Sequence, residues 1–80
     1  MSRARDVVEV VARALAATPG EVAVVESDRR GSTVVELTMA PGELGRVIGR
    51  EGRTAAALRT LAAAAGELDG CKVVVDFDDE

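Results

Sequence analysis

Two glycines, Gly49 and Gly52, lie three positions apart between two apolar helical patterns, with only Arg50 and Glu51 between them. Glycine adopts positive φ at little cost and lets another molecule's backbone approach closely, because it has no Cβ. The pair therefore predicts a tight turn between a short helix and a long one. The turn carries a basic side chain and leads into the unpaired N–H groups of a helix N-terminus, a combination that suits a phosphate.

The chain has 80 residues, and we expect residues 1–80 to form one domain with an acidic tail at 76–80. A chain this short buries only roughly 60% of its surface on folding, so its core must be efficient. Hydrophobic residues make up 48% of the sequence, but Phe77 is the one aromatic residue. We therefore expect a tight core of small side chains, chiefly alanine and valine.

Cysteine content and hydropathy predict a soluble, cytoplasmic protein. Cys71 is the one cysteine, which rules out an intramolecular disulfide, and its place at the start of a valine-rich run predicts a buried thiol. The sequence has no apolar run of about 18 residues, the length that a membrane span needs. Charges at Asp6, Glu9 and Arg13 interrupt any signal-peptide core.

The formal charge of −4 comes from ten basic and fourteen acidic residues, which are unevenly distributed. Four of the acids lie within residues 76–80, which leaves ten acids and ten bases in residues 1–75. Residues 46–60 hold four arginines and one acid, Glu51. Because attraction to a polyanion depends on the local field as well as on total charge, this stretch can attract nucleic acid. Strong, sequence-blind binding driven by bulk charge is excluded.

Hydrophobic periodicity predicts six elements in the order α-β-β-α-α-β. They are helix 3–17, strand 21–28, strand 33–39, a short helix 43–48, helix 53–66 and strand 72–77. Thr18-Pro19-Gly20 ends the first helix, residues 29–32 connect a hairpin, and Gly66 or Gly70 ends the long helix. The simplest two-layer solution is an α+β fold, with the helices on one face of a three-stranded mixed sheet.

The same periodicity predicts which side chains point inward. The expected apolar faces are Val7, Val11 and Leu15 with Val8 and Ala12 on the first helix, Thr54, Leu58, Leu61 and Ala65 on the long helix, Val35, Leu37 and Met39 on the second strand, and Cys71, Val73, Val75 and Phe77 on the third.

The glycine turn matches one of three glycine-based phosphate motifs. A P-loop needs Lys and Ser or Thr after its last glycine, and neither follows Gly49 or Gly52 in that register. The dinucleotide fingerprint needs a further glycine at position 47 and a preceding strand, but position 47 is Val and the preceding segment is predicted to be helical. What remains is Ile-Gly-x-x-Gly between two helices, the turn with which KH domains clamp a nucleic-acid backbone.

Residues 47–53, Val-Ile-Gly-Arg-Glu-Gly-Arg, resemble the core signature of KH domains. The predicted element order is similar to the type II, prokaryotic version of that fold, and the whole chain resembles the bacterial stand-alone KH proteins, the KhpA-like family. The resemblance implies a single-stranded RNA-binding protein that acts as a post-transcriptional regulator or RNA chaperone. It also implies a homodimer, or a heterodimer with a second KH-containing protein.

The resemblance assigns roles within the turn. Gly49 and Gly52 would allow close approach of the RNA backbone, Arg50 would meet phosphates, and a groove beside the turn would hold about four unstacked bases. Two positions depart from the family pattern: Glu51 is acidic where a phosphate should pass, and Thr54 replaces an aliphatic residue. The implied RNA-binding residues are Arg46, Ile48, Gly49, Arg50, Glu51, Gly52, Arg53 and Thr54.

Plainer interpretations stand beside these. A structural glycine turn would leave a protein-interaction adaptor with a KH-like fold and little RNA binding. Arg59 is typical of a solvated helix charge, and Arg29 and Arg30 of a hairpin tip. The small side chains at 56, 60 and 63 fit either a solvated surface or close packing in a dimer. The chain has no histidine, nucleophile–base pair or metal-ligand spacing, so we expect no catalysis, metal or cofactor.

Overall fold

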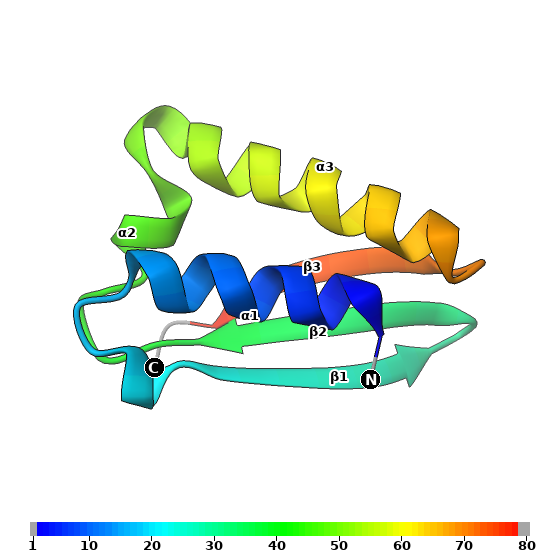
Figure 1. Ribbon diagram of the computed structural model, residues 1–80, viewed down its shortest axis with the longest axis horizontal. Coiled ribbons are helices and arrows are strands. Elements are labelled where there is room, and N and C mark those ends of the chain that lie inside the picture. The colour runs from blue at the N-terminus through cyan, green and yellow to red at the C-terminus, as the bar shows by residue number, and fades with distance from the viewer. Residues whose placement is uncertain (1, 79–80) are drawn as a thin grey trace.

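The computed structural model describes residues 2–78, and its helices and strands follow the predicted order. The elements are α1 (Arg3–Leu15), η1 (Pro19–Glu21), β1 (Ala23–Arg29), β2 (Ser32–Thr38), α2 (Gly45–Ile48), η2 (Arg50–Gly52), α3 (Arg53–Leu68) and β3 (Lys72–Asp78), where η denotes a 3₁₀ turn. β2 is the central strand, antiparallel to β1 and parallel to β3. The helices cover one face of this sheet (Figure 1). The predicted α+β fold with a mixed sheet is confirmed.

Both long helices end at positions that differ from the prediction. α1 stops at Leu15, and Ala16 is already extended at φ −73° and ψ 141°. The residue before a proline is disfavoured in the helical region, so the chain must leave the helix before Thr18 and Pro19. α3 continues through Gly66 to Leu68, and Gly70 takes the positive φ of +71° after the helix.

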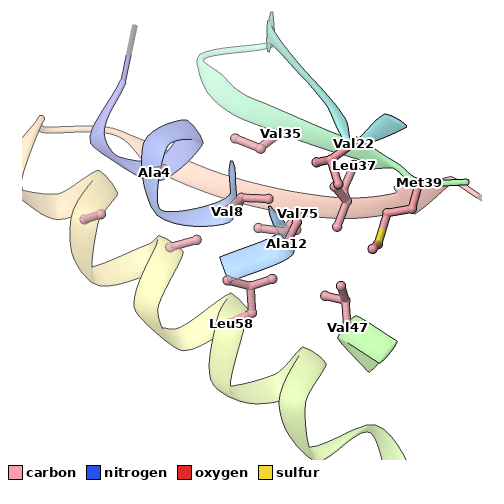
Figure 2. Close-up of a cluster of buried hydrophobic side chains, with 12 residues drawn as sticks. Ala4, Val8, Ala12, Val22, Val35, Leu37, Met39, Val47, Leu58 and Val75 are labelled. Carbon is pink, nitrogen blue, oxygen red and sulfur yellow. The ribbon is translucent and has the colours of Figure 1, made fainter. Parts of the chain in front are cut away.

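The core lies between the helices and the sheet (Figure 2). Leu37, Leu58, Val8, Val35 and Val47 are its largest fully buried side chains. Burying one such side chain contributes roughly 1.5–3 kcal/mol, so a few of them account for a large part of the stability of a small domain. The remaining buried members are Ala4, Ala12, Val22, Met39, Ala62, Ala65 and Val75. The prediction of a small aliphatic core is confirmed.

The predicted strand faces are largely correct, whereas the helix faces are rotated. α3 buries Ala55, Leu58, Ala62, Ala65 and Gly66. Leu61, predicted to face inward, is 54% exposed. α1 turns Ala4, Val8 and Ala12 inward, while Leu15 is exposed. Small residues face the core because α1 and α3 pack against each other and need close approach of their backbones.

The prediction for Cys71 is wrong, and the third strand ends one residue later than predicted. Cys71 precedes β3 and is exposed, with its thiol 3.4 Å from the Asp69 carbonyl oxygen. β3 runs one residue past the predicted strand 72–77, so Asp76 and Asp78 of the expected acidic tail both lie within it and pair with β2. Asp79 and Glu80, the rest of that predicted tail, lie outside the described residues.

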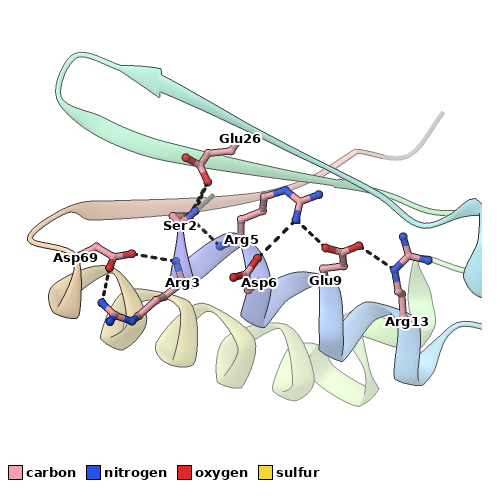
Figure 3. A network of polar contacts seen from close by, with 8 residues as sticks. All are labelled: Ser2, Arg3, Arg5, Asp6, Glu9, Arg13, Glu26 and Asp69. Carbon is pink, nitrogen blue, oxygen red and sulfur yellow. Dashed lines mark hydrogen bonds and ion pairs between the residues drawn. The ribbon is translucent and has the colours of Figure 1, made fainter.

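Polar contacts fasten the start of α1 to the rest of the fold (Figure 3). The Ser2 hydroxyl accepts from the Arg5 N–H at 3.1 Å and donates to the Glu26 carboxylate of β1 at 2.6 Å. The Arg3 N–H donates to the Asp69 carboxylate, beyond α3, at 2.9 Å. The first turn of α1 is therefore held to both the sheet and the end of α3.

Candidate nucleic-acid interface

Residues 49–52 form a turn with three left-handed backbone positions. Gly49 has φ +75° and ψ 177°, a conformation open essentially to glycine alone, and it stops α2. Glu51 and Gly52 follow at φ +56° and +72°. The Gly52 N–H donates to the Gly49 carbonyl at 3.2 Å, which closes the turn. α3 begins at the next residue, so the turn presents the N-terminus of a 16-residue helix.

The two glycines of the turn have different surroundings. A Cβ added to Gly49 would collide with the Thr54 side chain, standing 2.8 Å from its Cβ and closer still to its hydroxyl. A Cβ on Gly52 would meet no atom of the described residues within 4 Å. Thr54 therefore packs directly against Gly49 and supports the turn, and Gly52 faces open space.

Charges around the turn are exposed and mostly basic. Arg46 and Arg50 are exposed, and the Arg53 guanidinium lies 3.0 Å from the Glu51 carboxylate. The side chains of that pair are 80% and 68% exposed, so the contact is weak, worth well under 1 kcal/mol, and is screened by salt. Glu51 therefore does not block the turn: Arg53 partly offsets its charge, and either group can turn to a ligand.

Val47 and Ile48 show how α2 places the turn. Val47 is fully buried in the core, which anchors this four-residue helix. Ile48 is half-buried and is followed at once by Gly49, so it lies beside the turn. All eight predicted site residues lie in one continuous stretch of α2, the turn and the start of α3.

A residue that the sequence reasoning missed is Glu43, which fixes the loop before α2. Its carboxylate accepts from the Thr18 hydroxyl at 2.7 Å and from the N–H groups of Thr18 and Ala17 at 3.1 and 2.9 Å. These hydrogen bonds, led by that of the Thr18 hydroxyl, hold the pKa of Glu43 below its ordinary value. The partners are 25 and 26 residues apart in sequence, so no local pattern could have found them.

Arg59 is also more than the solvated charge that was predicted. Its guanidinium carbon lies 4.8 Å from the centre of the Phe77 ring, a cation–π arrangement between α3 and β3. This pair lies along α3 from the glycine turn and brings together two residues 18 positions apart, again beyond the reach of a local pattern.

The family comparison identifies the fold that carries this site. A family model described as the KhpA/KhpB KH domain matches residues 5–77. The chain belongs to this family. Its relatives include proteins named RNA-binding protein KhpA from Aquifex aeolicus (42% identical; 96% of this chain and 98% of the relative), Halalkalibacterium halodurans (40%; 94% and 99%) and Clostridium acetobutylicum (39%; 91% and 97%). No solved structure matches the chain.

The KhpA/KhpB match places the Gly49–Gly52 turn inside the matched region, between two helices of a KH domain. The predicted resemblance to this family is thus confirmed. None of the helices within residues 2–78 is long and apolar enough to cross a membrane.

Proposed function

We propose that this protein binds single-stranded RNA and holds the RNA backbone on the Gly49–Gly52 turn. The observation that carries the proposal is the turn itself: positive-φ glycines directly before α3, with exposed arginines on both sides. The relatives named RNA-binding protein KhpA support it, because this chain matches them over nearly their whole length. We assign a binding role without catalysis, in the cytoplasm, as a post-transcriptional regulator or RNA chaperone.

Four features of the turn suit it to a phosphate. Gly52 leaves room for the sugar-phosphate backbone, because no Cβ projects from it. Arg50 supplies a charge-assisted donor, and the first N–H groups of α3 carry the positive end of the helix dipole. Arg53 can leave Glu51 for a phosphate, since their ion pair is exposed. Unstacked bases then lie beside the turn, next to Ile48.

The test compares two variants with the same change in charge. Arg50→Asp with Glu51→Asp puts two acids in the turn, and Arg30→Asp makes an equal change at the hairpin tip. Arg30 already has φ +56°, which Asp tolerates. In fluorescence anisotropy with a labelled single-stranded RNA, we expect the first variant to lose binding at moderate salt and the second to keep it, with native circular dichroism for both. Retained binding by the turn variant would show that the turn is not the site.

We also propose that the protein functions as a dimer, because a single KH domain offers a small RNA surface and pairing raises avidity. The helical layer carries large exposed apolar side chains: Val10 on α1, 68% exposed, and Leu61 and Leu68 on α3, 54% and 73% exposed. This surface differs from the small-residue stripe at 56, 60 and 63. A second copy of the chain is the partner we favour, and a second KH-containing protein could use the same surface.

Light scattering at tens of micromolar tests the dimer. The chain has a mass of 8.3 kDa. We expect twice that mass for the natural sequence and the single-chain mass for Leu61→Glu, since a carboxylate in an apolar interface is costly to desolvate. Leu15→Glu, another exposed apolar position, serves as the control. A single-chain mass for the natural sequence would contradict the dimer.

A further inference from the structure

We infer that Arg59 and Phe77 form a subsite on which one unstacked RNA base stacks, a second contact point that complements the phosphate clamp at the turn. This inference rests on the proposed RNA binding and names the strand residue that takes part in it. The base would stack on the outer face of the Arg59 guanidinium, with the Phe77 ring beneath it.

The geometry of the pair prepares Arg59 for that role. Its guanidinium carbon lies 4.8 Å from the ring centre, Arg59 is exposed, and Phe77 is half-buried on the inner side of the sheet. Phe77 pairs in register with Leu37 and packs against the buried core, which holds the ring in place. The ring holds the planar Arg59 cation in place at the surface. Because this side chain is already ordered in the free protein, binding a base costs less conformational entropy.

The pair also has no acidic partner in the described part of the chain. Within residues 2–78, no carboxylate forms an ion pair with Arg59. Asp76 and Asp78 flank Phe77 in β3, but successive side chains of a strand point to opposite faces, so these two acids project from the other side of the sheet. Arg59 therefore keeps a guanidinium face for a ligand, in contrast to Arg53 with Glu51.

The subsite lies along α3 from the turn. α3 runs antiparallel to β3, because Arg59 meets Phe77 while Gly66 packs on Val73. At 1.5 Å per residue, Arg59 lies about 10 Å along the helix from Gly52. Exposed positions 53, 56 and 59 follow one another at i, i+3 and i+6, and the small Ala56 between the two arginines leaves room for a strand to pass.

Nucleobases stack on aromatic rings and on Arg guanidinium planes, and Phe77 is the one aromatic residue of the chain. Two simpler roles compete. Arg59 could contact a phosphate only, for which Lys would serve equally. The pair could also be a purely structural link between α3 and β3, in which case RNA would be indifferent to it.

The experiment crosses protein variants with RNA variants. A labelled ten-nucleotide single-stranded RNA of mixed sequence is compared with the same RNA carrying one abasic site at each position in turn. We expect one abasic site to lower the affinity of the natural protein about tenfold. Arg59→Lys should lose about tenfold on the intact RNA and nothing further at that abasic position. Its salt dependence should stay unchanged, because the charge is kept. Arg30→Lys is the matched control.

Phe77→Leu keeps apolar packing and removes the ring, and it should reproduce the Arg59→Lys result while thermal unfolding shows that the fold is retained. If Arg59→Lys bound the intact RNA as tightly as the natural protein does, the subsite would be overturned, but the proposed clamp at the turn would not be affected. If Arg59→Lys lost further affinity to the same extent at every abasic position, the subsite would also be overturned. If the natural protein bound none of these RNAs, the proposed function itself would fail, and the subsite with it.

Discussion

At the scale of single residues, the turn depends on two glycines for different reasons. Gly49 needs both its backbone conformation and its missing Cβ, because Thr54 fills the space beside it. Gly52 needs only the left-handed conformation at φ +72°. The same Gly-x-x-Gly spacing therefore combines one position sensitive to folding with one whose open side can serve a ligand.

This difference predicts unequal costs for two alanine variants. Gly49→Ala combines strained backbone with overpacking and should lower the free energy of unfolding by about 3 kcal/mol. Gly52→Ala adds only the left-handed strain, about 1 kcal/mol. Urea unfolding monitored by circular dichroism measures both. Equal losses would mean that Thr54 does not support the turn.

Glu51 offers a test of charge in the turn. Glu51→Gln keeps the length of the side chain and removes its charge, so a passing phosphate meets less repulsion. We expect the affinity for single-stranded RNA to rise about threefold at low salt, and less at high salt. Anisotropy titrations at two salt concentrations provide the measurement, with unchanged thermal unfolding as the control. A fall in affinity would show instead that the carboxylate itself contacts RNA.

Residue chemistry that is local in sequence could be predicted, and long-range contacts could not. Gly49 and Gly52 could be recognised from the sequence, because a turn with positive φ and the close approach of another backbone both favour glycine. Glu43 and the Arg59–Phe77 pair depend on partners from other elements, and their sequence surroundings look like ordinary surface. The burial of Cys71 was mispredicted because a valine-rich run does not say where its strand begins.

At the scale of elements, α3 is positioned by small residues rather than by leucines. α3 buries three alanines and one glycine, and Leu58 is its one large buried side chain. Helical periodicity predicted the helix but set its inner face by Leu58 and Leu61, and only Leu58 of these two is buried. Close packing against α1 and β3 decides the orientation, and that information lies outside the helix.

Gly66 is the clearest test of that close packing. A Cβ there would collide with the Val73 side chain and stand 2.9 Å from the Cys71 carbonyl oxygen. Gly66→Ala should lower the free energy of unfolding by about 1–2 kcal/mol, although alanine favours helices. Gly45→Ala in α2, where a Cβ meets nothing within 4 Å in the described part of the chain, is the control and should be neutral or stabilising. Stabilisation by Gly66→Ala would contradict the packing of α3 on β3.

At the scale of the whole molecule, four hydrogen-bonded carboxylates share one response to pH: Glu26, Glu43 and Asp69 join distant segments, whereas Glu9 bonds within α1. Hydrogen bonds lower the pKa of each: from the Arg5 side chain for Glu9, the Ser2 hydroxyl for Glu26, the Thr18 hydroxyl for Glu43 and the Arg3 N–H for Asp69. A carboxyl with a lower pKa in the folded state stabilises the fold above its unfolded pKa. That contribution is lost as the pH falls through the folded value.

We therefore expect the free energy of unfolding to be level from pH 7 to about pH 5 and to fall below about pH 4.5. Urea titrations across this range measure it. Glu43→Gln should be less stable than the natural protein at pH 7 and show a shallower decline in acid, because one of the responding groups is gone. Stability that increases between pH 5 and pH 3 would contradict the role of these contacts.

The element order and the mixed sheet follow from hydrophobic periodicity over the whole chain, and the family match at residues 5–77 agrees with them. What the periodicity could not supply is how the layers rotate against one another, since that depends on packing between α1, α3 and the sheet.

The most direct test of the central claim is an NMR titration of the ¹⁵N-labelled protein with a short single-stranded RNA. If RNA binds at the turn, the largest amide shift changes fall at residues 49–54 and continue along α3 towards Arg59, while the hairpin tip at Arg30 stays unchanged. Shift changes concentrated at the hairpin tip or on the outer face of the sheet, with residues 49–54 unaffected, would contradict it.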